Sequence, residues 1–202
     1  MIMTDKIGII NCGVGNIGSI KQSLKIAGMD ADEIFDPLYI SQYSKIILPG
    51  VGAFDHFMQR LHDRGFVTPI LHYAENENNV LLGICVGMQA LCTFGEENVL
   101  TTGLDLISGH VKKIEISNDL RLPHVGWNDV QFVKRSLAES SYYFTHSFSV
   151  HLENTDDLLA TTKYGTQITA AIQKDNIIGV QFHPEKSGVS GSRFLANIMH
   201  EA

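Results

Sequence analysis

A cysteine framed by two glycines is the strongest chemical signal in the sequence. Cys85 lies within residues 83–87 (GICVG), directly after the apolar run Val80–Ile84 and before a helical pattern. This is the spacing of a nucleophile elbow, a sharp turn between a strand and a helix that exposes the nucleophile. The turn needs neighbours without a Cβ because strand and helix approach closely there. A buried, inert cysteine is the alternative, and the framing glycines favour the nucleophile.

A histidine and a glutamate at a predicted strand end supply the base that a thiol nucleophile needs. The apolar run Ile177–Phe182 ends in His183, Pro184 and Glu185. In an extended chain residues i and i+2 point to the same side, and the proline biases His183 towards that conformation. Glu185 can then hydrogen-bond one ring nitrogen and leave the other for Cys85. The pattern predicts a cysteine–histidine–glutamate triad.

A glycine-rich strand end offers hydrogen-bond donors. Residues 48–53 (LPGVGA) fit the end of a strand that turns into a helix. Consecutive backbone N–H groups of Gly50, Val51 and Gly52 can point into one cleft, which is what a tetrahedral oxyanion needs. A plain Pro-Gly turn is the alternative.

A second glycine motif points to a different function. Residues 13–18 (GVGNIG) match the dinucleotide-binding pattern, and Glu33 or Asp36 stands about where its acidic residue is expected. The match is weak because 18 of the 202 residues are glycine and Asp36 precedes a proline. A tight turn with Asn16 capping a helix is the simpler explanation of the motif. A nucleotide-binding module on this turn is the alternative to an enzyme.

The elements that would position these residues alternate in the first half of the chain. Apolar runs predict strands at Ile7–Ile10, Lys45–Leu48 and Val80–Ile84. Amphipathic patterns predict helices at Asn16–Ala27, Ala53–Arg64, Val67–Glu75 and Val86–Phe94. Such alternation is typical of a parallel sheet with helices on both faces.

The second half is richer in strands. Short β-branched and aromatic runs predict strands at His110–Ile116, Asp129–Val133, Tyr142–Val150, Leu158–Lys163, Thr169–Gln173 and Ile177–Phe182. A final helix is expected at Ser192–His200. The sequence shows no repeat and no linker. We therefore expect an α/β fold, a single domain over residues 1–202, with an open, mostly parallel sheet flanked by helices and antiparallel strands in the second half.

Composition excludes several classes of protein. The formal net charge of −7 argues against a surface for nucleic acid or anionic lipid. The three cysteines are an odd number in a chain of 202 residues, which predicts free thiols in a reducing compartment. No signal peptide or membrane-spanning run is visible. A cytoplasmic location is expected.

These motifs together resemble the signatures of class I, triad-type glutamine amidotransferases. The three main signatures are residues 49–52 (PGVG), 83–89 (GICVGMQ) and 179–187 (GVQFHPEKS). Three further motifs are residues 11–16 (NCGVGN), 123–128 (PHVGWN) and 143–148 (YFTHSF). The likeness follows the chain in order from about residue 7 to 199.

The resemblance implies hydrolysis of glutamine to glutamate and ammonia. It makes Cys85 the nucleophile, His183 the general base and then acid, and Glu185 the residue that orients His183. It implies an oxyanion hole from Gly50, Val51, Gly52 and Val86, and substrate contacts from Gln89, His146, Ser147 and Phe148. It places Asn11, Asn16, Trp127, Asn128 and Lys186 on a face turned to a partner. It implies neither a cofactor nor a metal ion.

The resemblance also implies a partner. Within the class, the chain is most similar to glutaminase subunits that form a heterodimer with a (β/α)8-barrel synthase or cyclase subunit. That partner uses ammonia to make imidazole glycerol phosphate and AICAR for histidine biosynthesis. Close relatives instead serve a sugar-modifying partner in surface-polysaccharide pathways, and Val86, Thr145 and Phe148 depart from the commonest pattern. A cysteine hydrolase that acts alone on esters or lactones is a third possibility.

Overall fold

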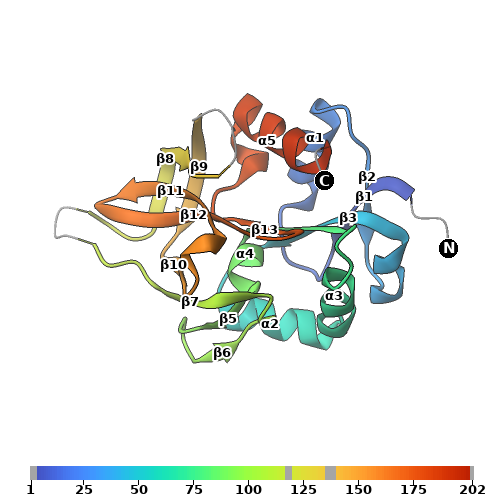
Figure 1. The fold of residues 1–202 in the computed structure, drawn as a ribbon, viewed down its shortest axis with the longest axis horizontal. Helices are drawn as coiled ribbons and strands as arrows, with labels where there is room; N and C mark the ends of the chain where they lie inside the picture. The colour runs from blue at the N-terminus through green and yellow to red at the C-terminus, as the bar shows by residue number, and fades with distance from the viewer. Residues whose placement is uncertain (1–3, 117–119, 135–139, 201–202) are drawn as a thin grey trace.

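A parallel sheet forms the centre of the molecule. The computed structural model describes residues 4–116, 120–134 and 140–200 (Figure 1). Its largest sheet has the strand order β2-β1-β3-β4-β13-β12-β11-β8-β9, and the pairings from β2 to β13 are parallel. The parallel strands are β1 (Thr4–Ile10), β2 (Ala31–Ile34), β3 (Tyr43–Gly50), β4 (Val80–Cys85) and β13 (Ile177–Val180). Strand β4 is buried at every position because both faces of the sheet are covered.

Helices lie on both faces of the parallel strands. Figure 1 shows α1 (Ile17–Ile26) and α5 (Gly188–His200) on one face, and α2 (Phe54–Asp63) and α3 (Val67–Ala74) on the other. The short 3-10 helix η1 (Pro37–Gln42) connects β2 to β3. The predicted sheet with helices on both faces is therefore confirmed.

Antiparallel strands extend this sheet and build a second one. The large sheet continues with β12 (Thr166–Lys174), β11 (Leu158–Tyr164), β8 (His124–Phe132) and β9 (Ser140–His146). The smaller sheet contains β10 (Phe148–Leu152), β7 (Ile107–Lys113), β5 (Cys92–Gly95) and β6 (Thr101–Thr102). Two 3-10 helices, η2 (Thr155–Asp157) and η3 (Pro184–Lys186), complete the order.

One predicted helix is too long and one predicted strand is in fact two, and tertiary pairing explains both differences. The predicted helix Val86–Phe94 ends early, since α4 covers only Val86–Ala90 and β5 follows. Within β5, Phe94 pairs with His110 of β7, which a local pattern does not reveal. The predicted strand Tyr142–Val150 is two strands, because the chain leaves the large sheet after β9 and enters the small sheet as β10.

The turn before α1 has the predicted position but not the predicted bond. Asn16 is the N-cap residue of α1, yet its side chain makes no capping bond to the backbone. Its Oδ1 instead accepts a hydrogen bond from Ser19 Oγ at 3.0 Å.

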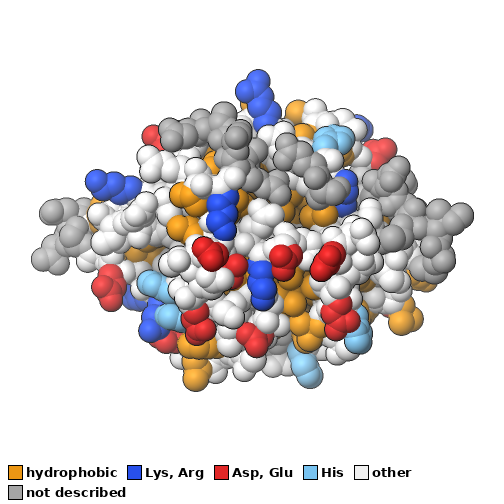
Figure 2. Space-filling model, in the orientation of Figure 1, with side chains coloured by type: hydrophobic (Ala, Val, Ile, Leu, Met, Phe, Trp, Pro, Cys, Tyr) orange, Lys and Arg blue, Asp and Glu red, His pale blue; other side chains and the backbone are white. Residues whose placement is uncertain are grey.

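The surface shown in Figure 2 carries acidic and basic side chains close together, with small groups of hydrophobic side chains between them. Among the described residues, no helix is long and apolar enough to cross a membrane.

Candidate active site

One cavity lies at the carboxyl ends of the central parallel strands. Its volume is about 360 Å³, in the range of small-molecule sites. Its lining comprises Val51, Gly52, Cys85, Val86, Gln89, Glu97, Pro123, Thr145, His146, Ser147, Phe148, His183 and Lys186. Ten of these thirteen residues were singled out from the sequence. The fold therefore brings the elbow, the histidine and the glycine-rich strand end to one place.

The turn at Cys85 has the geometry of an elbow. Cys85 is the N-cap of α4, with φ 54° and ψ −111°, a left-handed conformation that is strained for a residue with a side chain. A Cβ on Gly83 would lie 2.6 Å from the carbonyl oxygen of Gly87. A Cβ on Gly87 would lie 1.9 Å from the carbonyl oxygen of Leu48. Close backbone contacts therefore leave no room for a Cβ at either position, which is why both must be glycine.

His183 is fixed by its own segment and by β9. Its Nδ1 lies 2.8 Å from Glu185 Oε1, and the side chains are 2% and 1% exposed. Because the carboxylate accepts, Nδ1 carries the proton and Nε2 is left for another group. The backbone N–H of His183 donates to the Tyr143 carbonyl at 2.8 Å, and Ser187 Oγ donates to the His183 carbonyl at 2.6 Å.

The electrostatic surroundings of His183 favour its protonated form. Burial alone disfavours an imidazolium, but hydrogen bonding and charge interactions with Cys85 and Glu185 outweigh it and raise the pKa of His183 to about 9. Nε2 of His183 is buried and has no hydrogen-bond partner within 4–116, 120–134 and 140–200. The protonated ring can therefore donate a proton from Nε2 to a group bound beside Cys85.

Sequence analysis missed a second group that contacts the thiol. Gln181 is fully buried, and its Nε2 lies 3.7 Å from Cys85 Sγ. Its Oε1 accepts from Gln89 Nε2 at 3.0 Å. The only signal in the sequence is an amide within an otherwise apolar strand end, two residues before His183.

The glycine-rich strand end lies beside the elbow. Gly50 is paired in parallel register with Cys85, and a Cβ on Gly50 would lie 2.5 Å from the backbone nitrogen of Gly87. Val51 and Gly52 line the cavity, as does Val86, whereas Gly50 does not. Gly52 has φ +93°, a conformation that glycine adopts without strain. The backbone of this segment can therefore reach a group bound at Cys85.

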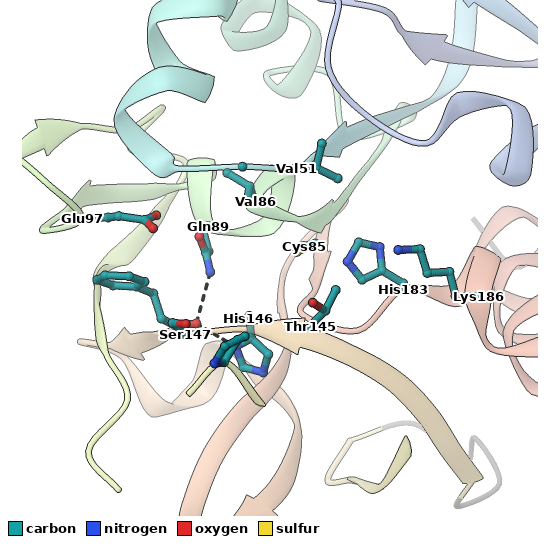
Figure 3. A pocket seen from close by; sticks show the side chains of 13 residues that line it. Val51, Cys85, Val86, Gln89, Glu97, Thr145, His146, Ser147, His183 and Lys186 are labelled. Atoms are coloured by element: carbon teal, nitrogen blue, oxygen red, sulfur yellow. Dashed lines mark hydrogen bonds between the residues drawn. The ribbon is translucent and has the colours of Figure 1, made fainter. Parts of the chain in front are cut away.

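The residues expected to contact substrate form the opposite wall. Gln89 donates from Nε2 to the Phe148 carbonyl at 3.2 Å, and His146 Nδ1 donates to the same oxygen at 2.8 Å (Figure 3). His146 Nε2 then accepts from His124 Nδ1 at 3.1 Å. Burial lowers the pKa of His146 and of His124 to about 4, so both rings are neutral at pH 7. These side chains hold the wall, and Ser147 lies within it.

A carboxylate in the cavity was not predicted. Figure 3 shows Glu97 on the side of the cavity opposite His183 and Lys186. Glu97 lies in the turn between β5 and β6, beyond the helix that the sequence pattern predicted to end at Phe94. Thr145 and Pro123 also line the cavity without having been singled out as site residues. Residue type alone does not distinguish Glu97 from the adjacent Glu96.

The residues expected to face a partner lie outside the cavity, except Lys186. Trp127 is 58% exposed, and its ring meets Tyr143 edge-on at 6.3 Å. Lys186 Nζ lies 5.8 Å from the centre of the Tyr143 ring and lines the cavity mouth. Asn128 Nδ2 donates to the Lys163 carbonyl at 2.8 Å. Trp127 is therefore not a core residue.

The acidic residues of the alternative dinucleotide motif have structural partners. Glu33 Oε2 accepts from Asn11 Nδ2 at 2.9 Å, and Glu33 Oε1 lies 3.5 Å from Lys21 Nζ. Asp36 caps η1 by accepting from Leu38 N at 3.0 Å. A Cβ on Gly15 would lie 3.1 Å from the ring of a proline in β3. The motif is explained by close packing and local hydrogen bonds.

Comparison with known proteins identifies the family of this chain. The family described as "Glutamine amidotransferase class-I" matches residues 9–202. The imidazole glycerol phosphate synthase subunit HisH 2 of Methanococcus maripaludis is 42% identical over 202 residues, which cover 97% of this chain and 100% of that protein. The subunit HisH of Geobacter sulfurreducens is 41% identical over 203 residues, covering 95% and 97%.

Solved structures agree with the fold. A structure described as "Crystal structure of glutamine amidotransferase" superposes with a TM-score of 0.78 at 16% identity, covering 97% of this chain and 99% of that chain. At such low identity the likeness concerns the fold alone, whereas the family match extends over nearly the whole sequence. The chain belongs to the class I glutamine amidotransferase family.

Proposed function

We propose that this chain is the glutaminase subunit of an imidazole glycerol phosphate synthase and supplies ammonia for histidine biosynthesis. The observation that carries the proposal is that Cys85 and His183 line one cavity and that Glu185 is hydrogen-bonded to His183. Their order, nucleophile then base then orienting acid, is that of a nucleophilic triad. The names of the relatives support the pathway.

The cavity has the polarity that glutamine requires. The α-ammonium group of glutamine fits beside Glu97, and the side-chain amide of the substrate then extends towards Cys85 and His183 (Figure 3). The α-carboxylate is left to backbone donors near Ser147 and Phe148, which line the same wall. This placement brings the amide carbon to the thiolate.

The reaction then follows from the geometry. Cys85 Sγ attacks the amide carbon, and the oxyanion accepts from N–H groups of the Gly50–Gly52 segment and of Val86. His183 Nε2–H gives its proton to the leaving nitrogen, so ammonia departs and a thioester remains. Water attacks the thioester while His183 takes its proton, which releases glutamate and restores the pair. Glu185 keeps the ring in place throughout.

Released ammonia needs a dry path, because bulk water protonates it to ammonium and removes its nucleophilicity. Trp127 and Val125 are 58% and 56% exposed and lie on the same side of β8. Exposed apolar side chains of this kind suit a protein interface. We therefore infer a heterodimer with a cyclase subunit of (β/α)8-barrel type that receives the ammonia.

The test of this function is glutamate release with and without the partner. We expect purified chain plus the histidine-pathway cyclase and its nucleotide substrate to convert glutamine to glutamate and to form imidazole glycerol phosphate. Glutaminase activity with no response to that cyclase would reassign the partner to another pathway, such as polysaccharide synthesis. Absence of glutamine hydrolysis under both conditions would contradict the proposal.

The raised pKa of His183 predicts the pH dependence. Because its pKa is about 9, the imidazolium persists at neutral pH and is lost as pH rises through that value, so kcat/KM should fall above pH 9. Glu185→Gln removes one of the charges that stabilise the imidazolium. The variant should lose activity by about 100-fold and shift this limb to lower pH. A pH–rate profile checks both effects, with Glu153→Gln, an exposed site, as the matched control.

A further inference from the structure

Glu97 contacts both the cavity and the first turn of α2. Its carboxylate lines the cavity, and its Oε2 accepts a hydrogen bond from the backbone N–H of Phe54 at 2.9 Å. Phe54 is the first residue of α2, whose N-cap residue is Ala53. Alanine has no side chain to cap a helix, so the first-turn donor is satisfied by a carboxylate from 43 residues further along the chain.

Two other contacts hold the same turn against α2. A Cβ on Gly95 would lie 2.7 Å from the Phe54 ring, so the backbone of the turn rests directly on that ring. Asn98 adopts φ +60° and donates from Nδ2 to Asp55 Oδ1 at 3.1 Å. Gly95, Glu97 and Asn98 therefore contact the first turn of α2 at three points.

The Gly50–Gly52 segment, which is proposed to hold the oxyanion, ends just before α2 begins. Upstream, Gly50 is fixed by its register with Cys85. Between Gly50 and α2, the chain has little to restrain it: Val51 is 38% exposed, and the position of a Cβ on Gly52 has no atom within 4 Å. The first turn of α2 is the downstream anchor of this segment, and Glu97 holds that anchor.

We infer that Glu97 is a positioning residue for the oxyanion hole. One carboxylate oxygen, Oε2, caps α2 and thereby fixes the downstream end of the Gly50–Gly52 segment, while the side chain also lines the cavity in which the substrate ammonium is proposed to bind. The inference rests on the proposed glutaminase function. A negative charge at the N-terminus of a ten-residue helix is also favoured by the helix dipole, which strengthens the cap.

A substrate without the ammonium group distinguishes the capping role of Glu97 from its role in binding the ammonium. Glutaramate is glutamine without its α-amino group, so its turnover does not depend on a charge pair with Glu97. We would compare Glu97→Ala, which removes the cap, with Glu97→Gln, whose amide oxygen can still accept from Phe54 N–H. The assays use the complex with the cyclase, and Glu96→Ala is the matched control because that side chain pairs with Lys112.

We expect kcat for glutaramate to fall about 10-fold in Glu97→Ala and to stay within about threefold of wild type in Glu97→Gln. Both variants should raise KM for glutamine. If Glu97 serves the ammonium alone, both variants would hydrolyse glutaramate like wild type, and the inference would be overturned. Failure of the wild type to hydrolyse glutamine would instead contradict the proposed function.

Hydrogen exchange tests the cap without any turnover. The Phe54 amide of the wild type should exchange at least about 10-fold more slowly than an uncapped first-turn amide, and Glu97→Ala should remove that protection. Rapid exchange at Phe54 in the wild type would overturn the inference even if Glu97→Ala failed to fold or glutaramate proved to be no substrate.

Discussion

Cys85→Ala should abolish glutamine hydrolysis and leave the free energy of unfolding nearly unchanged. The side chain is small and 4% exposed, and alanine keeps its Cβ in the same turn. Without the sulfur no thioester forms, and we expect kcat to fall by at least about 1000-fold. Glutamate release measured at saturating glutamine, with the cyclase partner present, reports the loss.

The other two cysteines provide the control. Cys12 and Cys92 are free and buried like Cys85, but neither lines the cavity. Burial raises the pKa of both thiols, which keeps them protonated and unreactive. Cys12→Ala and Cys92→Ala should therefore retain glutaminase activity. Hydrolysis that survived in Cys85→Ala would show that another residue is the nucleophile.

Gly87→Ala should have the largest effect on stability. The added Cβ would lie 1.9 Å from the carbonyl oxygen of Leu48, within the backbone of β3, so no side chain can move aside to make room. We expect the free energy of unfolding to fall by about 3 kcal/mol or more, with loss of activity in any folded fraction. Urea denaturation measures the difference.

Gly18→Ala is the matched control for this substitution. Gly18 lies in α1, and the position of its Cβ has no atom within 4 Å. Alanine has the higher helix propensity, so the variant should be more stable by about 0.5–1 kcal/mol. If Gly87→Ala and wild type had the same free energy of unfolding, the close backbone contact described at the elbow would be contradicted.

The triad was predictable because its signals are local. The glycines around Cys85 follow from one tight turn, and the pairing of His183 with Glu185 follows from two positions of one extended segment. The meeting of the two segments, 98 positions apart, follows from the rule that parallel strands share their carboxyl ends. Each step depends on backbone geometry that a short stretch of sequence specifies.

Glu97 and Gln181 were not predictable for the opposite reason. Glu97 reaches the cavity only because β5 pairs with β7 and turns the chain back over α2. Gln181 points at Cys85 Sγ from a strand end whose other residues are apolar. Long-range pairing decides which of two adjacent acids, Glu96 or Glu97, faces the cavity, and no local pattern contains that information.

The passage of one chain segment from the large sheet to the small sheet has a thermodynamic consequence. Cys85 and His183 follow strands of the large sheet, whereas Phe148 and Glu97 are placed by the small one. Local unfolding of the small sheet alone would therefore leave the nucleophile and its histidine together and withdraw Phe148 and Glu97 from the cavity. In such a species the site would keep its reactive groups but lose part of its substrate pocket. The stability of the small sheet thus sets how often the enzyme is competent to bind glutamine.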